Sequence, residues 1–241
     1  MEKLLGIIIP VYNESENIER TLTEIEAAVS TPHRIYIVYD FEEDDTLPVA
    51  RELKKRGIDI QFLKNDRGGV CNAIKSGLFH AKEDYLLVTM ADMSDDFRAV
   101  DRMYQLMQKG WDLVCGSRYM KGGRQIGGPW LKKTLSRLAG VSLRYVTGLP
   151  THDATNSFKL YRKRLFDSIN IESDTGFVIG MEIVIKAYFS GFSVTEIPCT
   201  WTDREKGKSR FKTFQWGPYY LRWYLYAIGQ ALLNKRGGCI V

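Results

Sequence analysis

Acidic side chains follow three apolar segments in the N-terminal part of this 241-residue chain, near Glu14, Asp40 and Asp92. If these segments are parallel strands, their carboxyl ends share one edge of a sheet, where open α/β sheets bind ligands. Carboxylates at such an edge can hold a divalent cation that bridges the phosphates of a nucleotide. For the segment ending at Asp92 alone, an acidic helix start is an equal alternative, because serine and aspartate are good cap residues. Three acidic strand ends in register favour the phosphate site.

The strands and helices that must position these carboxylates are predicted from the alternation of short apolar segments, typical of buried strands, with amphipathic segments, typical of helices. Strands are predicted within residues 4–14, 34–39, 58–63, 85–88, 111–119, 158–161 and 194–198, the last being the final strand. Helices are predicted after a cap at Ser15, around Val49 and Leu53, and over residues 70–80, 99–109, 131–147 and 180–189. This order predicts an α/β fold, with a doubly wound, mostly parallel central sheet flanked by helices. Residues 121–129 are rich in glycine and are expected to be mobile.

The composition describes an ordinary globular protein, with 44% hydrophobic and 26% charged residues. The formal net charge is +5, and basic and aromatic residues are concentrated together in the last forty residues. This combination indicates a phosphate-bearing or anionic-membrane partner, and no nucleic-acid-binding module accompanies it. The four cysteines lack metal-type spacing, which predicts reduced thiols in a cytosolic protein. A membrane-spanning helix is not expected, since no run of about 18 apolar residues occurs.

Several short motifs, taken in order, resemble a known family. The segment Ile-Ile-Pro-Val-Tyr-Asn-Glu at residues 8–14 resembles the opening of glycosyltransferase family 2, whose members have the nucleotide-diphospho-sugar transferase (GT-A type) fold. The resemblance continues through the segment ending at Asp40, the Gly68-Gly69 loop and the region of Asp92. Residues 116–119, 153–158, and 203–204 with 207–209 are similar to the dolichol-phosphate mannosyltransferase subgroup. The similarity covers roughly residues 4–215.

The resemblance implies roles for individual residues. Those expected to bind the nucleotide-sugar are Pro10, Tyr12, Glu14, Asp40, Arg67, Gly68, Gly69 and Asp92. Those expected to bind an acceptor phosphate are Arg118, Lys132, Arg137, Arg204 and Ser209. Among these, Asp92, Arg118 and Arg204 are expected to be catalytic. Asp92 and Ser94 are expected to hold Mg²⁺ or Mn²⁺.

The sequence departs from the family pattern at the positions that should bind metal. The first of two paired aspartates after the second strand is Tyr39 here, so only Asp40 remains. The family's Asp-x-Asp reads Met90-Ala91-Asp92, and Ser94 replaces an expected glutamine. A thioether is a soft ligand that does not suit Mg²⁺. Metal binding would therefore depend on Asp92 together with the donor's phosphates.

The activity implied by the resemblance is an inverting transfer of a sugar from a GDP- or UDP-linked donor to a polyprenyl phosphate. The acceptor is already anionic, so positioning and charge stabilisation suffice without a strong general base. One alternative is a soluble family 2 glycosyltransferase with a saccharide or protein acceptor, for which Asp153 or Glu182 could act as base. A second alternative is a catalytically weakened nucleotide-sugar-binding protein, suggested by Met90 and Tyr39.

Two segments are predicted to contact the cytoplasmic face of a membrane peripherally. The chain is divided into a catalytic domain, residues 1–213, and an amphipathic segment, residues 214–241, in which tryptophan and tyrosine accompany basic residues. Residues 131–147 would form a second interfacial helix. The alternative is that both segments bury their apolar faces against the sheet or against a second copy in a homo-oligomer.

Overall fold

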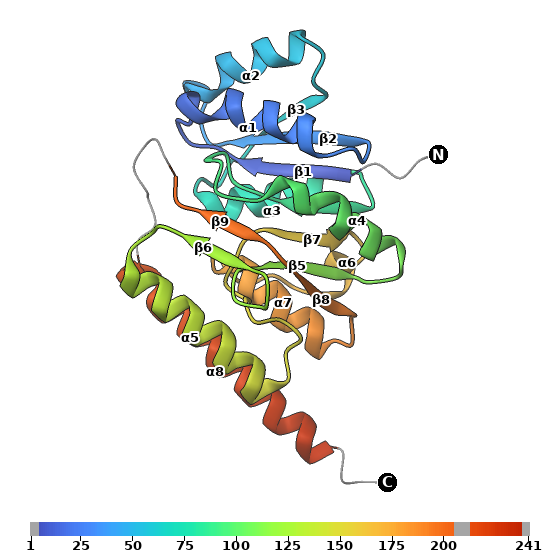
Figure 1. Ribbon diagram of the computed structural model, residues 1–241, viewed down its shortest axis with the longest axis vertical. Coiled ribbons are helices and arrows are strands. Elements are labelled where there is room, and N and C mark those ends of the chain that lie inside the picture. The colour runs from blue at the N-terminus through green and yellow to red at the C-terminus, as the bar shows by residue number, and fades with distance from the viewer. Residues whose placement is uncertain (1–4, 205–212, 238–241) are drawn as a thin grey trace.

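The structure is a computed structural model that describes residues 5–204 and 213–237, with no side-chain description for 213–214 and 234–237 (Figure 1). Its centre is a seven-stranded sheet in the order β3-β2-β1-β4-β7-β5-β8. The strands are β1 Leu5–Pro10, β2 His33–Tyr39, β3 Ile60–Lys64, β4 Tyr85–Val88, β5 Leu113–Ser117, β7 Lys159–Arg162 and β8 Val194–Pro198. The predicted mostly parallel α/β sheet is confirmed.

One strand of the sheet departs from the doubly wound parallel prediction. β7 lies between β4 and β5 and is antiparallel to both, with Leu160 opposite Leu87 and Val114. The chain enters β7 from the edge at which β4 and β5 end, because the loop of residues 151–158 that follows the helix at Trp130–Thr147 lies at that edge. That loop brings Asp153 beside the end of β5.

Helices cover both faces of the sheet (Figure 1). They are α1 Ser15–Ala28, α2 Thr46–Lys55, α3 Val70–His80, α4 Val100–Gln108, α5 Trp130–Thr147, α6 Leu165–Ser168, α7 Ile179–Phe189 and α8 Thr213–Gly237. Successive side chains of β1 point to opposite faces, so Ile7 and Ile9 join the core under α1, α2 and α4, whereas Ile8 joins the core under α3 and α7. Burial of each such side chain stabilises the fold by about 1.5–3 kcal/mol.

The glycine-rich segment contains a strand, which corrects the expectation of a mobile loop. β6 Arg124–Ile126 pairs in parallel with β9 Thr200–Thr202, so β8 is not the final strand either. A Cβ on Gly123 would lie 2.3 Å from the carbonyl oxygen of Ser117, so only glycine permits this turn. A glycine-rich composition indicates flexibility, but Gly123 is needed here because the backbone at Ser117 passes close to it.

The start of α1 also differs from the prediction. Ser15 is the first helical residue, and Glu14 occupies the N-cap position without a side-chain capping bond. The N–H of Ser15 is instead bonded by Asp45 Oδ1 (3.2 Å), and the N–H of Glu14 by Thr46 Oγ1 (2.9 Å). The loop after β2 therefore holds the beginning of α1.

α5 and α8 lie side by side on one flank of the molecule (Figure 1). Trp223 and Ala227 of α8 join the same core cluster as Leu143 of α5 and the residues of α7. Both helices carry many large apolar side chains that are exposed: Trp130, Leu131, Leu135, Leu138, Tyr145, Val146, Tyr219, Leu221, Leu225, Tyr226, Leu232 and Leu233. No helix within the described part of the chain is both long and apolar enough to cross a bilayer. The division at residue 213 stays a prediction.

Candidate active site

The loop after β1 is fixed by a buried carboxylate that sequence reasoning did not single out. Asp44, 1% exposed, accepts the N–H of Asn13 with both oxygens (3.1 and 3.1 Å) and the N–H of Thr46 (2.9 Å). Asn13 has φ of 52°, a left-handed conformation that asparagine tolerates. The acidic cluster after β2 was the available signal for Asp44. Its effect is to present Tyr12 and Glu14 at the edge where β1 ends.

Asp40 and the Gly68-Gly69 loop meet as predicted. Asp40 Oδ2 accepts the N–H of Gly69 (2.7 Å), and Oδ1 accepts a hydrogen bond from Asn65 Nδ2 (2.7 Å). Both glycines have positive φ, 67° and 81°, which side chains rarely adopt. Tyr12 is 44% exposed and packs edge-on against Phe41, with ring centroids 5.1 Å apart. An exposed aromatic ring beside close-approaching backbone suits stacking against a flat ligand.

Arg204 joins two of the predicted acidic strand ends. Its Nη2 lies 2.7 Å from Asp92 Oδ2 and 3.3 Å from Glu14 Oε1, and its Nε lies 3.2 Å from the same Asp92 oxygen. Glu14 Oε2 also accepts a bond from Asn17 Nδ2 (2.7 Å). Burial opposes the charge of Arg204, but the hydrogen bond and charge of Asp92 and the charge of Glu14 raise its pKa. Glu14 and Asp92 thus converge, as the strand order predicts, on one guanidinium.

The side chains at the predicted metal site do not fit a divalent-metal centre. Asp92 Oδ2 binds Arg204, and its Oδ1 accepts the N–H of Ser94 (3.2 Å), a residue only 3% exposed. Met90 packs against the core cluster of α3 and α7. Asp95 accepts bonds from Thr89 Oγ1 (2.7 Å) and Met90 N (3.3 Å), and burial raises its pKa to about 7. Within residues 5–204 and 213–237, no three His, Cys, Asp or Glu side chains are grouped as metal ligands.

Arg118, at the end of β5, forms a buried ion pair with Asp153. Its Nε lies 2.7 Å from Asp153 Oδ2 and its Nη2 lies 2.8 Å from Oδ1, while its backbone N–H also binds Oδ2 (3.0 Å). Ser136 Oγ of α5 and Thr155 Oγ1 each lie 3.2 Å from Nη2. Burial would raise the pKa of Asp153, but the charge and hydrogen bonds of Arg118 lower it below its ordinary value. The guanidinium is therefore rigidly positioned and remains charged.

A basic cavity of about 190 Å³ opens beside this ion pair. It is lined by Arg118, Tyr119, Met120, Gly123, Arg124, Gln125, Lys133 and Arg137. Two of the predicted acceptor-binding residues, Arg118 and Arg137, are therefore brought together, whereas Arg204, predicted to bind the same phosphate, lies against Asp92 and Glu14. Burial and the charge of Arg118 lower the pKa of Lys132, while Asp203 and Asp92 oppose that shift. The charge of Lys132 therefore interacts both with Arg118 beside the cavity and with Asp92 at the end of β4. Ser209 lies outside the described residues.

Asp153 and Glu182, the two carboxylates considered as a general base, are both bonded to other groups of the protein. Asp153 is fully buried against Arg118. Glu182, also fully buried, accepts the N–H groups of Glu172 (2.6 Å) and Ser173 (2.8 Å) and lies 2.8 Å from Lys186 Nζ. Both carboxylates are therefore already bonded to a cationic side chain, whereas a general base must be able to accept the proton of the acceptor hydroxyl.

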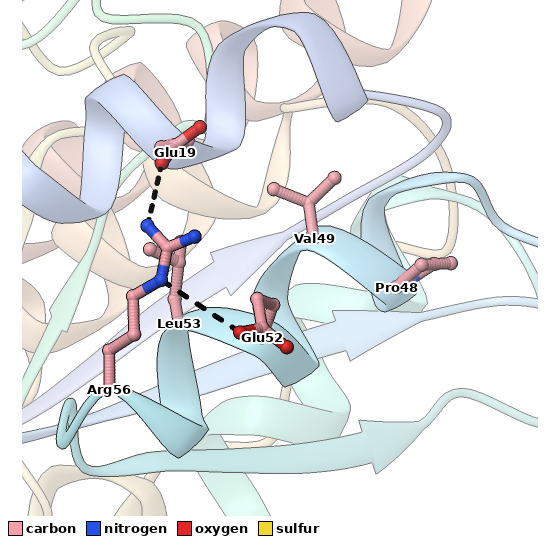
Figure 2. Close-up of a pocket in the computed structure, with 6 residues that line it drawn as sticks. All are labelled: Glu19, Pro48, Val49, Glu52, Leu53 and Arg56. Carbon is pink, nitrogen blue, oxygen red and sulfur yellow. Dashed lines mark hydrogen bonds and ion pairs between the residues drawn. The ribbon is translucent and has the colours of Figure 1, made fainter.

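A second hollow, between α1 and α2, contains none of the predicted site residues (Figure 2). Its volume is about 300 Å³, and it is lined by Glu19, Pro48, Val49, Glu52, Leu53 and Arg56. Arg56 lies 3.2 Å from Glu19 of α1, across the hollow, and 4.0 Å from Glu52, one turn earlier in α2. Exposed pairs of this kind contribute little to stability, about 0–1 kcal/mol, and they do not suggest chemistry.

Comparison with known proteins identifies the family. The family described as Glycosyl transferase family 2 matches residues 6–169, so the chain belongs to it and is a glycosyltransferase. Polyprenol monophosphomannose synthase of Mycolicibacterium smegmatis is 31% identical over 228 residues, covering 88% of this chain and 86% of that protein. Dolichol-phosphate mannosyltransferase of Pyrococcus furiosus is 29% identical over 213 residues, covering 86% of this chain and 59% of that protein.

Solved structures confirm the predicted GT-A type fold. Glucosyl-3-phosphoglycerate synthase from Mycobacterium tuberculosis, in complex with Mn²⁺, UDP and glucosyl-3-phosphoglycerate, superposes with a TM-score of 0.69. The sequences are 14% identical, and the match covers 94% of this chain and 80% of that one. The same enzyme with Mg²⁺ and UDP gives a TM-score of 0.68.

Proposed function

We propose that this glycosyltransferase moves a sugar from a nucleotide-diphospho-sugar to a polyprenyl phosphate at a membrane surface. The observation that carries the proposal is the basic cavity beside α5, a helix whose outward face is apolar. A polyprenyl phosphate has an anionic head and a long apolar chain, so it matches a cationic cavity bordered by an apolar helix. The names of the two relatives, a polyprenol monophosphomannose synthase and a dolichol-phosphate mannosyltransferase, support this acceptor class.

The donor is assigned to the edge where β1, β2 and β4 end. The nucleoside would contact Pro10, Tyr12, Glu14 and Asp40 together with the Arg67–Gly69 loop, and the diphosphate would lie near Asp92 and Arg204. The UDP bound to a solved structure of the same fold supports a nucleotide donor, either GDP- or UDP-linked. The expected Mg²⁺ or Mn²⁺ at Asp92 and Ser94 is not part of this proposal, because Arg204 already binds Asp92, and no step of the mechanism depends on a metal ion.

The proposed chemistry is a single displacement. An oxygen of the acceptor phosphate forms a bond to the anomeric carbon while the bond to the donor's β-phosphate oxygen breaks, and the nucleoside diphosphate leaves. Arg118, Lys132 and Arg137 would hold the acceptor phosphate, and Arg204 would stabilise charge on the leaving group. Because the acceptor oxygen is already anionic, the engagement of Asp153 and Glu182 elsewhere does not impede the reaction. Attack from the face opposite the leaving group inverts the anomeric configuration.

Membrane contact is assigned to α5 and α8. Their outward apolar residues form one flank, and α5 has four basic residues, Lys132, Lys133, Arg137 and Arg144, without an acidic one. Apolar side chains flanked by cations suit the interface of an anionic membrane. We keep the division into a catalytic domain, 1–213, and an interfacial segment, 214–241, as part of this proposal. A homo-oligomer that covers the same flank is the competing arrangement.

The acceptor class is tested by transfer assays that offer polyprenyl phosphate, polyprenol or saccharide acceptors with GDP- and UDP-sugars. Transfer to polyprenyl phosphate alone is expected, and Arg137→Gln should reduce kcat/KM for it by about tenfold through loss of a charged phosphate contact. Transfer to saccharides instead would contradict the proposal.

The membrane surface is tested by co-sedimentation with vesicles containing anionic lipid. Leu138→Glu, on the apolar flank, is expected to release the protein, because it places a carboxylate in the interface. Phe79→Glu is the matched control, since Phe79 of α3 is 51% exposed but lies outside the flank. Equal sedimentation of both variants, together with an unchanged monomer–oligomer equilibrium, would count against the membrane assignment.

A further inference from the structure

The guanidinium of Arg204 binds the carboxylate of Asp92, at which a metal ion is expected. It binds Asp92 through two nitrogens, at 2.7 and 3.2 Å, and reaches Glu14 at 3.3 Å. All three side chains are mostly buried, with exposed fractions of 18% for Arg204, 13% for Asp92 and 16% for Glu14. Water and salt screen the attraction within such a pair less than in an exposed pair, and the hydrogen bonds to a charged acceptor are short and directional.

The backbone of Arg204 is delivered to this position by the small sheet. The N–H of Thr202 in β9 binds the carbonyl of Ser94 (3.0 Å), and the N–H of Asp203 binds the carbonyl of Ile126 (2.9 Å). These bonds attach β9 both to the loop that carries Asp92 and to β6. The contact between Arg204 and Asp92 is therefore built into the fold rather than made by a long surface side chain.

The position that would supply a second metal ligand is apolar. Met90 lies two residues before Asp92 and packs against the core cluster. Replacing a carboxylate with a thioether removes one negative charge and one hard ligand from this edge. Arg204 is the shared cation of Glu14 and Asp92, so a side chain of the protein itself offsets one of these two negative charges.

We propose that Arg204 acts as a built-in cation at the donor-diphosphate site, so that the chain binds a nucleoside diphosphate without a divalent metal ion. This inference rests on the proposed function, because it takes the edge at Asp92 as the donor-phosphate site. A phosphate would displace the longer contact to Glu14 and leave the shorter contact to Asp92 in place. A guanidinium carries five N–H donors, so Arg204 can donate to a phosphate while it keeps its contact to Asp92, and it stays charged at every accessible pH.

The test is calorimetric titration of the full chain with GDP and with UDP, in EDTA and in Mn²⁺. The nucleotide that binds is expected to do so with affinities within about threefold in the two conditions, a difference below 1 kcal/mol. Arg204→Gln should lose about tenfold or more in EDTA, and Mn²⁺ should restore part of the loss by binding the released Asp92. Arg204→Lys should lose less, since it keeps the charge but not the two-donor geometry.

The matched control is Arg56→Gln, which breaks an arginine–glutamate contact between α1 and α2 (Figure 2). It should leave nucleotide affinity unchanged in both conditions. Wild-type binding that requires Mn²⁺, or an Arg204→Gln variant that binds like wild type in EDTA, would overturn the inference and leave the donor site intact. If neither nucleotide binds in either condition, the donor site of the proposed function fails as well.

Discussion

The two regions proposed as the donor side and the acceptor side of this glycosyltransferase are both held by carboxylates, but these carboxylates have different partners. On the donor side, Asp44 and Asp40 bind backbone N–H groups of loops. On the acceptor side, Asp153 binds the buried guanidinium of Arg118. A carboxylate on backbone N–H groups fixes a loop whatever side chains the loop carries. A buried ion pair fixes a charged side chain, and each partner depends on the other.

The largest loss of stability is expected when Asp153 is replaced. Asp153→Ala leaves Arg118 charged and unpaired in the interior, so the free energy of unfolding should fall by about 3–5 kcal/mol. Urea unfolding measures this change. The double variant Arg118→Met with Asp153→Ala removes both charges and should be less destabilised than Asp153→Ala alone. A single variant that costs under about 1 kcal/mol would show that the pair is not a buried one.

A smaller effect is expected on the donor side. Asp44→Ala removes the acceptor from the N–H groups of Asn13 and Thr46, which should lower the free energy of unfolding by about 2 kcal/mol. It should also weaken nucleotide binding, because the loop that carries Tyr12 and Glu14 is no longer fixed. Asp45→Ala is the control, since Asp45 is exposed and binds only the N–H of Ser15 in this way (3.2 Å). Equal losses in the two variants would argue that the burial of Asp44 is unimportant.

The smallest effect concerns pH. Asp101 of α4 binds Ser30 and Thr31, at the loop before β2, through their backbone N–H and hydroxyl groups. Burial opposes ionisation, but these bonds lower the pKa of Asp101 from 3.8 to about 2. A folded-state pKa below the unfolded one stabilises the protein above pH 3.8 and loses that stabilisation as pH falls towards 2.

The expected size of this contribution is about 1–2 kcal/mol after allowance for solvent screening. It is measured as the difference in unfolding free energy between the wild type and Asp101→Asn. That difference should be present near neutral pH and should shrink as the solution is acidified below pH 3.8. A difference that is independent of pH would mean that the hydrogen bonds do not depend on the charge of Asp101.

The sequence predicts the donor side well because its structure is local. Each unit there is a strand followed by a helix, so a motif such as Pro10 to Glu14 lies directly at a strand end, and strand ends converge by topology. Asp40 beside Gly69, and Glu14 beside Asp92, follow from that order. The specific bond from Asp44 to Asn13 does not follow, because several carboxylates after β2 could equally have turned inwards.

The acceptor side was predicted less well because long-range pairings define it. The direction of β7, the pairing of β6 with β9, and the contact from Arg118 to Ser136 each join segments that are distant in sequence. Glycine-rich composition around Gly123 suggested mobility, whereas the close approach to Ser117 shows an ordered turn. Amphipathic residues 131–147 predicted α5 correctly, yet periodicity does not reveal that α8 would pack beside it. The position of Ser209 stays a prediction outside the described residues.

The contact between Arg204 and the donor edge has a consequence for how the enzyme is made. Arg204 is 112 positions from Asp92 and 190 positions from Glu14 along the chain. Closing loops of this length slows folding, because their entropy is lost before the contact forms. During synthesis, Glu14 and Asp92 leave the ribosome well before Arg204, since domains emerge from the N-terminus first. We therefore expect the strands to be paired before the diphosphate site is complete, so that a nascent chain binds nucleotide more weakly until Arg204, just after β9, has been added.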